Sequence, residues 1–199
     1  MNVATRQKIV MTALELFYAK GFNSTSISDI LSRSQVHSGS LYHFFPGKQD
    51  LLVAVLEFYR DGIRENLLDI AWVGVDDPIE RIFALLGGYR TGLLVSDFAH
   101  GCPIGNLALE LSEPDPRIRE LLDINFRNWI SAIETCLVDA GDRLPASTDR
   151  KALAEFILTI MEGAIMQART ARDIGVFDRN VAVLREYMSL LEIQAREAA

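Results

Sequence analysis

The side chains best suited to binding chemistry lie in one stretch of this sequence, residues 25–52. Within it, residues 38–43 read Ser-Gly-Ser-Leu-Tyr-His, a run rich in small and hydrogen-bonding side chains. Two short helical patterns lie on either side of a tight polar turn in this stretch. That arrangement is typical of a helix-turn-helix, whose second helix places such side chains against phosphates and base edges. The stretch therefore predicts a DNA-reading motif.

The ends of these two short helices follow from local sequence. Ser26 and Asp29 stand three residues apart, the spacing of a capping box, and this predicts that the first helix begins here. Pro46 and Gly47 end the second helix, because proline lacks the amide that a helix needs. Helices this short are unstable alone in water, so the motif must be supported by its neighbours.

Cys102 is a second candidate for chemistry. It lies between Gly101 and Pro103 at the start of a predicted helix, where the helix dipole favours a thiolate. His100 is two residues away, which leaves a Cys-dependent hydrolase open as a hypothesis, although no acid is placed to orient the histidine. A buried, unreactive cysteine is the favoured alternative.

Charge is divided unevenly along the chain of 199 residues. The first 60 residues carry six Lys or Arg and four Asp or Glu, a balance of +2, so the formal net charge of −7 leaves −9 for the rest. A mildly basic front on an acidic body suits a protein that presents one face to DNA. There is no signal-peptide pattern, no apolar run of membrane length and only two cysteines, so we expect a cytoplasmic protein with no membrane partner.

The three histidines do not predict a metal site. His37 and His43 share a domain but lack an acidic or cysteine partner at ligand spacing, and His100 lies far along the chain. We expect no metal and no cofactor.

Apolar residues recur at helical spacing along the whole chain, and no segment alternates with period two. The pattern predicts an all-α fold of nine helices. They cover residues 1–20, the two short helices of the motif, 50–72, 78–96, 104–111, 115–140, a helix of about 25 residues capped by Ser147 or Thr148, and a last helix that begins at Asp178.

The first 60 residues resemble the tetracycline-repressor (TetR) family of bacterial regulators. The resemblance is carried by Ile9, Ala13, Phe17, Lys20, Gly21, Phe22, Thr25, Ser26, Ile27, Asp29, Ile30, Val36, residues 39–45 and residues 48–52. It implies a three-helix helix-turn-helix DNA-binding domain at 1–47 and a helical ligand-binding and dimerisation domain at 48–199. It also implies a homodimer in which the last two helices of each subunit form a four-helix bundle.

The same resemblance assigns the DNA contacts. By motif position they are Thr25, Ser38, Gly39, Ser40, Tyr42, His43 and Lys48, with Thr25 and Lys48 as phosphate anchors. The recognition helix holds neither Arg nor Asn, so we expect phosphate contacts and DNA shape to supply much of the binding.

The resemblance places an effector site among the helices that follow the motif. Aromatic and soft apolar residues are the first candidates, polar residues within apolar faces the second, and Cys102 the third, because some family members sense oxidants or electrophiles with a cysteine in this neighbourhood. The candidates are Phe83, Tyr89, Phe126, Trp129, Met161, Met166, Asn106, Glu162 and Cys102. A structural role remains open for each of them.

Together these patterns predict a DNA-binding transcriptional regulator and not an enzyme. We expect a homodimeric repressor that a small molecule, or an electrophile, releases from a palindromic double-stranded DNA operator. A constitutive dimeric DNA-binding protein without an effector is the alternative, and the Cys-dependent hydrolase is the less favoured one.

Overall fold

The computed structural model describes residues 3–111 and 113–198. The elements in chain order are α1 (Val3–Lys20), α2 (Ile27–Ser34), α3 (Ser38–Phe44), α4 (Lys48–Ile63), η1 (Arg64–Leu68), α5 (Asp69–Ala71), α6 (Pro78–Val95), α7 (Pro103–Glu110), α8 (Pro116–Asp139), η2 (Gly141–Arg143), α9 (Arg150–Ala171) and α10 (Ile174–Glu197). Met1, where the first helix was predicted to begin, lies outside the described residues.

The predicted nine-helix, all-α fold is confirmed. Helix α4, the π-helical segment η1 and α5 follow one another without a break, so they count as one helix, and the described residues contain no strand. This continuous helix matches the predicted one at 50–72. Its π-helical turn was not predicted, because a one-residue widening of the helix leaves the apolar pattern almost unchanged.

Two predicted helix starts are wrong by a few residues. Helix α9 is capped by Asp149, whose carboxylate accepts the N–H of Ala152 at 3.0 Å, and not by Ser147 or Thr148. Helix α10 begins at Ile174 with Asp173 as its cap, four residues before the predicted Asp178. In both cases an aspartate directly before the first helical residue supplies the cap, and aspartate is as good an N-cap as serine.

The chain divides into two compact units. The first unit holds Met1–Gly62 and Pro103–Asn125, and the second holds Ile63–Cys102 and Phe126–Ala199. Helix α7 and the start of α8 therefore belong with the helix-turn-helix. The predicted division into functional domains at 1–47 and 48–199 stays a prediction.

The first unit is built around the apolar faces of α1, α2 and α3. Ile9, Ile30 and Leu41, one from each helix, are completely buried. Gly21 ends α1 with φ +87°, and the ring of Phe22 then packs edge-on against Phe17 at 5.2 Å between ring centroids. These contacts supply the support that the short helices need.

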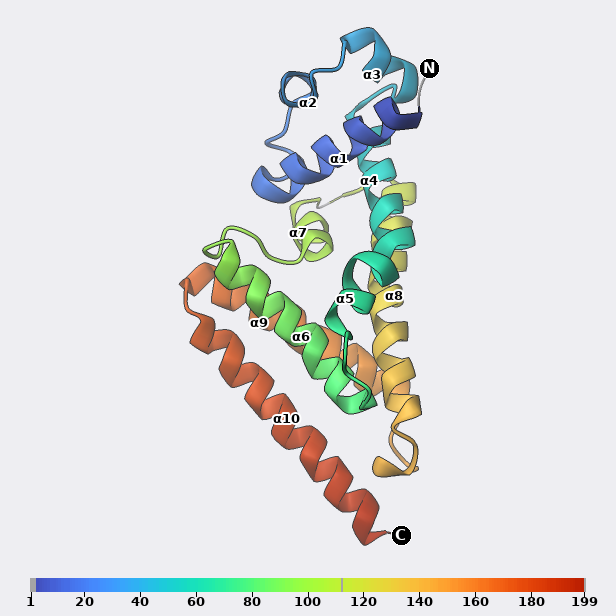
Figure 1. The fold of residues 1–199 in the computed structure, drawn as a ribbon, viewed down its shortest axis with the longest axis vertical. Coiled ribbons are helices and arrows are strands. Elements are labelled where there is room, and N and C mark those ends of the chain that lie inside the picture. Colours follow the sequence, from blue (N-terminus) through green and yellow to red (C-terminus); the bar gives the residue numbers. More distant parts are fainter. Residues whose placement is uncertain (1–2, 112, 199) are drawn as a thin grey trace. The chain divides into compact units, whose positions relative to one another are not determined.

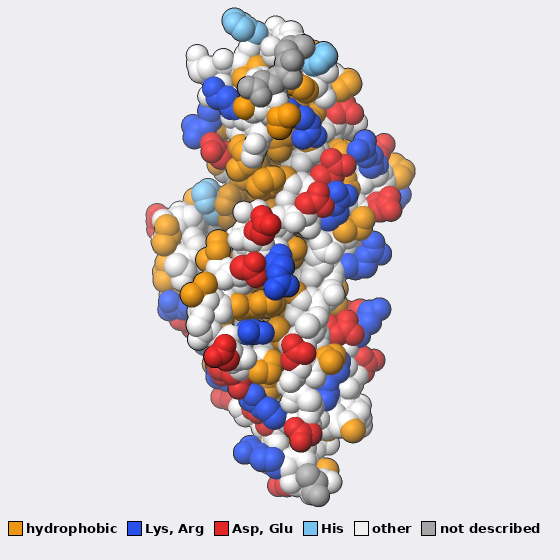
Figure 2. Space-filling model, turned by 45° about the vertical axis from the view of Figure 1, so that its right-hand side comes forward, with side chains coloured by type: hydrophobic (Ala, Val, Ile, Leu, Met, Phe, Trp, Pro, Cys, Tyr) orange, Lys and Arg blue, Asp and Glu red, His pale blue; other side chains and the backbone are white. Residues whose placement is uncertain are grey.

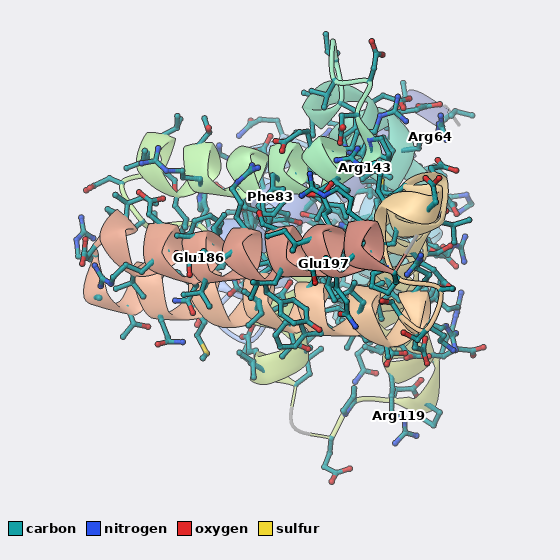
Figure 3. The ribbon with its side chains drawn as sticks, turned by 90° about the horizontal axis from the view of Figure 1, so that it is seen from below. Arg64, Phe83, Arg119, Arg143, Glu186 and Glu197 are labelled. Atoms are coloured by element: carbon teal, nitrogen blue, oxygen red, sulfur yellow. The ribbon has the colours of Figure 1, made fainter. Side chains whose placement is uncertain are left out.

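In the second unit α6, α9 and α10 lie side by side (Figures 1 and 3). Charged pairs join α6 to α10: Arg90 donates to Asp178 at 2.7 Å, and Arg185 donates to Glu80 at 2.6 Å. Phe83 lies between the two helices (Figure 3). The Arg185 guanidinium stacks over its ring. Among the described residues, no helix is both long enough and apolar enough to span a bilayer.

Candidate nucleic-acid interface

Helix α3 has one buried and one exposed face. Leu41 is completely buried and Phe45, just after the helix, is 3% exposed, while Tyr42 is 52% exposed. Ser38, Gly39 and His43 are also exposed, and Ser40 is half-buried. The outward face thus carries hydroxyl, imidazole and bare backbone, which are the groups that bind phosphates and base edges.

Gly39 has no packing role within the protein. A Cβ atom added there would have no atom within 4 Å apart from its chain neighbours and the backbone of its own helix. The position therefore faces open space, and the absence of a side chain allows another molecule to approach the α3 backbone closely.

Helix α2 is fixed by the predicted capping box. The Ser26 hydroxyl accepts the N–H of Asp29 at 3.1 Å, and the Asp29 carboxylate accepts the N–H of Ser26 at 2.8 Å. The hydrogen bond from the Ser26 backbone, together with the Lys20 ammonium at 3.0 Å, lowers the pKa of the Asp29 carboxyl to about 2. The cap is therefore fully formed at neutral pH.

Thr25 and Lys48 hold the turn between α1 and α2. The Thr25 side chain is buried, and its hydroxyl donates to the carbonyl oxygen of Gly21 at 2.6 Å. The Lys48 ammonium donates to the carbonyl oxygens of Phe22 at 2.9 Å and Thr25 at 3.0 Å, and it lies 4.3 Å from the centroid of the Phe22 ring. Both residues thus support the motif from inside.

Basic side chains also lie on the surface of the first unit, to which α3 belongs. Arg6 is exposed, with its guanidinium 5.3 Å from the centroid of the Phe45 ring, and Lys8 is exposed nearby in sequence. Arg33 is paired with Glu15 at 3.3 Å. Figure 2 shows histidine, Lys and Arg side chains gathered at the end of the first unit where α3 lies in Figure 1.

Glu110, at the end of α7, holds the turn that precedes α2, and sequence reasoning missed it. Its carboxylate accepts the N–H groups of Phe22 at 2.8 Å and Asn23 at 2.6 Å. A signal was present, since a carboxylate in the last turn of a helix faces the negative end of the helix dipole. The Glu110 carboxylate therefore needs hydrogen-bond donors from another part of the chain, but the sequence alone does not identify them.

The second unit contains two buried polar atoms that find no hydrogen-bond partner among the described residues. They are Nε1 of Trp129, on α8, and Oε1 of Glu162, on α9. Burial raises the pKa of Glu162, and a hydrogen bond from the Cys102 thiol opposes this in part. Trp129 also contacts the rings of Tyr89 at 6.5 Å and Phe126 at 6.1 Å. Buried orphan groups of this kind are costly unless a ligand or water completes them.

The structure brings together some effector candidates and separates others. Tyr89, Phe126 and Trp129 form one aromatic cluster, and Cys102 meets Glu162. Met161 is completely buried, Met166 is 50% exposed, and Phe83 packs under Arg185 at 3.7 Å. Asn106 lies in the other unit, on α7.

The sequence matches two described families that together span most of the chain. Residues 9–55 match "Bacterial regulatory proteins, tetR family", and residues 78–182 match "Transcriptional regulator LmrA/YxaF-like, C-terminal domain". The second match alone covers half of the chain. The chain belongs to the TetR family.

Relatives and solved structures agree with this TetR assignment. The HTH-type transcriptional regulator LmrA of Bacillus subtilis is 30% identical over 171 residues, covering 85% of this chain and 88% of LmrA. The HTH-type transcriptional repressor DhaR of Mycobacterium sp. is 25% identical, covering 91% and 90%. A crystal structure of regulatory protein TetR from Rhodobacter sphaeroides superposes with a TM-score of 0.80 at 28% identity, covering 89% and 95%.

This TetR-family chain is a transcriptional regulator that binds DNA, and it is not an enzyme. The hypothesis of a Cys-dependent hydrolase is therefore wrong. Its physical weakness is visible in the structure, because the Cys102 thiol is buried and donates to a carboxylate, which disfavours a thiolate.

Proposed function

We propose that this TetR-family regulator is a homodimeric repressor that a small molecule releases from a near-palindromic operator. The exposed hydroxyl and imidazole face of α3, fixed from behind by buried Leu41 and Phe45, is the observation that carries the DNA-binding part. Ser38, Gly39, Ser40, Tyr42 and His43 would make the contacts, with Lys48 as a phosphate anchor. Thr25 acts as a structural support of the turn.

A second copy of the chain is the partner that the surface of α9 and α10 favours. Helix α10 already buries one stripe within the subunit, formed by Phe177, Leu184, Met188, Leu191 and Ala195. Val183, Tyr187 and Leu190 form a second stripe at helical spacing that is 43–65% exposed, and Phe156 of α9 lies beside Tyr187 at 6.1 Å. An exposed apolar stripe of this extent suits a helix-to-helix interface between copies.

The small residues Ala164 and Ala168 of α9 lie outside this stripe, because both are buried within the subunit. Their small size serves packing within the subunit, and the exposed stripe of α10 alone supports a dimer.

An effector site in the second unit is favoured over a constitutive DNA-binding protein. The orphan atoms of Trp129 and Glu162 are the specific observation, since a protein that only dimerises has no use for unsatisfied polar groups in its interior. The aromatic cluster of Tyr89, Phe126 and Trp129 would supply apolar contact to the same ligand. An effector that binds the DNA-incompetent form more tightly would shift the population away from the operator.

An electrophile acting on Cys102 is a less favoured effector. The thiol is 2% exposed and neighbours the Glu162 carboxylate, and both features slow attack on an electrophile. Exposure of parent protein and Cys102→Ser to an electrophile decides the matter, because equal loss of DNA binding in both would exclude Cys102 as the sensor.

Binding-site selection with purified protein, followed by affinity measurements over a range of salt, tests the function. We expect selected sites to contain inverted half-sites about 34–36 Å apart, and affinity to fall steeply with salt. Tyr42→Phe and Ser40→Ala should weaken binding to the selected site by about tenfold each, the value of one contact. A flat salt response, or full affinity in both variants, would contradict the proposal.

A further inference from the structure

Arg6, near the start of α1, is held next to α3 by an aromatic ring. Its guanidinium lies over the ring of Phe45, 5.3 Å from the centroid, and Phe45 is the residue directly after α3. Phe45 is 3% exposed, so the core fixes its ring, whereas Arg6 itself is exposed. Helices α1 and α3 pack against each other in the first unit, which keeps the two residues together (Figure 1).

The positive charge of Arg6 is not neutralised within its own helix. The first turn of α1 holds no Asp or Glu, and the one carboxylate of α1, that of Glu15, pairs with Arg33 at 3.3 Å. Attraction to the Phe45 ring restrains the guanidinium and leaves its charge in place. Arg6 therefore presents to solvent a restrained cation whose N–H groups can donate to an anion.

The C-terminal end of α3 is a place where a DNA backbone needs a cation. The last carbonyl groups of a helix carry partial negative charge, which repels a phosphate. Helix α3 holds no Lys or Arg, and His43 in its last turn is its one basic side chain. The Arg6 guanidinium, over the residue that follows α3, supplies a full positive charge at this end.

An arginine suits this position better than a lysine does. A planar guanidinium can lie over an aromatic ring and at the same time donate two N–H groups to one phosphate. A side chain that is already restrained also loses less conformational entropy when it binds than a free side chain loses. A lysine at this position would keep the charge but lose the paired donors.

We propose that Arg6 is a phosphate-binding residue that fixes the C-terminal end of α3 on the backbone of double-stranded DNA. The inference rests on the proposed DNA-reading face of α3 and extends the interface to α1. The Phe45 ring holds Arg6 beside α3, so the two helices meet the DNA as one surface. A contact of this kind determines position and register but not base identity.

The first test measures the salt dependence of binding to a duplex of arbitrary sequence, so it needs no operator. Each neutralised phosphate contributes about 0.9 to the slope of log affinity against log salt concentration. We expect Arg6→Gln to reduce the slope by about that amount per subunit, and Lys8→Gln to leave it near the parent value. Lys8 is the matched control, because it is exposed, carries the same charge and lies about 200° around α1 from Arg6. Equal slopes in the two variants would overturn the inference.

The second test locates the phosphate on the operator that the parent protein selects. Each phosphate of one half-site is replaced in turn by an uncharged methylphosphonate. The parent should lose about tenfold in affinity at the phosphate that Arg6 binds, the value of one contact, and Arg6→Gln should lose nothing further there. Arg6→Lys should keep part of the sensitivity at that phosphate, which a purely structural role would not predict. If every replacement costs Arg6→Gln as much as it costs the parent, Arg6 binds no phosphate.

Failure of the proposed function and failure of this inference are distinguishable. If the parent protein selects no operator, the proposed reading face of α3 fails, while the salt slopes still decide whether Arg6 binds phosphate. If the parent selects an operator and neither test finds a contact, only the role of Arg6 fails. Circular dichroism should show the helix content of the parent in Arg6→Gln and Lys8→Gln, which excludes unfolding as the cause of a changed slope.

Discussion

Glu162 is a single residue whose burial lowers the stability of the fold. Its carboxyl group is buried in the second unit, one of its oxygens lacks a hydrogen-bond partner among the described residues, and burial raises its pKa. The folded protein therefore holds a proton on Glu162 at pH values where the unfolded chain has released it. Stability contributed by this group is present at low pH and is lost as pH rises through the folded-state pKa.

Glu162→Gln should accordingly stabilise the protein at pH values where the carboxyl must ionise. We expect the free energy of unfolding to rise by about 1 kcal/mol at alkaline pH and to change little at acidic pH, because the neutral amide removes the cost of ionising a buried carboxyl. Urea unfolding at an acidic and an alkaline pH measures the difference. The exposed Glu155→Gln serves as control, and a loss of stability at alkaline pH in Glu162→Gln would contradict the interpretation.

Ser26 is a residue whose role follows from sequence and structure alike. Ser26→Ala removes the hydroxyl that caps α2, which should cost about 1 kcal/mol and speed hydrogen exchange of the α2 amides about fivefold. Ser28→Ala, at the exposed second residue of the same helix, should leave exchange unchanged. Because the pKa of Asp29 is about 2, the box should weaken only as pH falls from about 4 towards that value. Equal exchange rates in both variants would exclude the capping role.

At the scale of residues, short-range patterns were predictable and long-range partners were not. The capping box involves residues three apart, so its spacing identifies it. The partners of Glu110 lie 87 and 88 residues away, and the two acceptors of Lys48 lie 23 and 26 away. Lys48 was identified by the family resemblance, but its contacts with the turn depend on how α4 packs and have no local signature.

At the scale of elements, the contact between α6 and α10 depends on one guanidinium that makes two kinds of contact. Arg185 donates to both oxygens of Glu80, at 2.6 and 3.0 Å, and lies 3.7 Å from the centroid of the Phe83 ring. The hydrogen bonds lower the pKa of Glu80, so this pair keeps its charge well into acid. A planar guanidinium can stack on a ring and donate two hydrogen bonds to one carboxylate at the same time, whereas the ammonium group of lysine cannot.

Arg185→Lys should therefore destabilise the second unit although it keeps the charge. We expect a loss of about 1 kcal/mol in the free energy of unfolding, from the weaker cation–π contact and the lost second hydrogen bond. Thermal unfolding measures this loss. Arg179→Lys is the control, because Arg179 is 71% exposed and pairs with Asp173 at the long distance of 3.8 Å. An equal effect of the two substitutions would show that the stacking on Phe83 contributes nothing.

Helix boundaries were predictable where a sequence break coincides with a cap. Asp77 and Pro78 mark the start of α6, which was predicted at 78, and the Asp77 carboxylate accepts the amide N–H groups of Ile79 and Glu80. The starts of α9 and α10 were harder, because several residues that can cap stand close together and tertiary packing selects one. The π-helical turn Arg64–Leu68 leaves no mark on composition at all.

At the scale of the whole molecule, the fold class was predictable because helical periodicity extends over the entire chain, and the family followed from the first 60 residues. The grouping of α7 with the helix-turn-helix was not, because it depends on Glu110 and on contacts across the sequence. The exposed apolar stripe of α10 was predictable only in part, since periodicity shows that Val183, Tyr187 and Leu190 share a face but does not show that the subunit leaves it uncovered.

Leu190→Glu tests whether a second copy covers this stripe. Leu190 is 62% exposed, so a glutamate there leaves the folded subunit intact and places a charge only in an interface between copies. We expect sedimentation to show a monomer at concentrations where the parent is a dimer. We also expect a loss of at least about 100-fold in operator affinity, because a monomer reads a single half-site.

Val95→Glu is the matched control, since Val95 is 83% exposed on α6 of the same unit and should tolerate the charge as a dimer. Circular dichroism of both variants should match that of the parent, which separates loss of the interface from loss of the fold. If Leu190→Glu sediments as a dimer with full operator affinity, the α10 stripe is not the surface that joins the two copies. If instead it becomes monomeric yet keeps full affinity, α3 reads its site without a partner, and the two-fold operator is excluded.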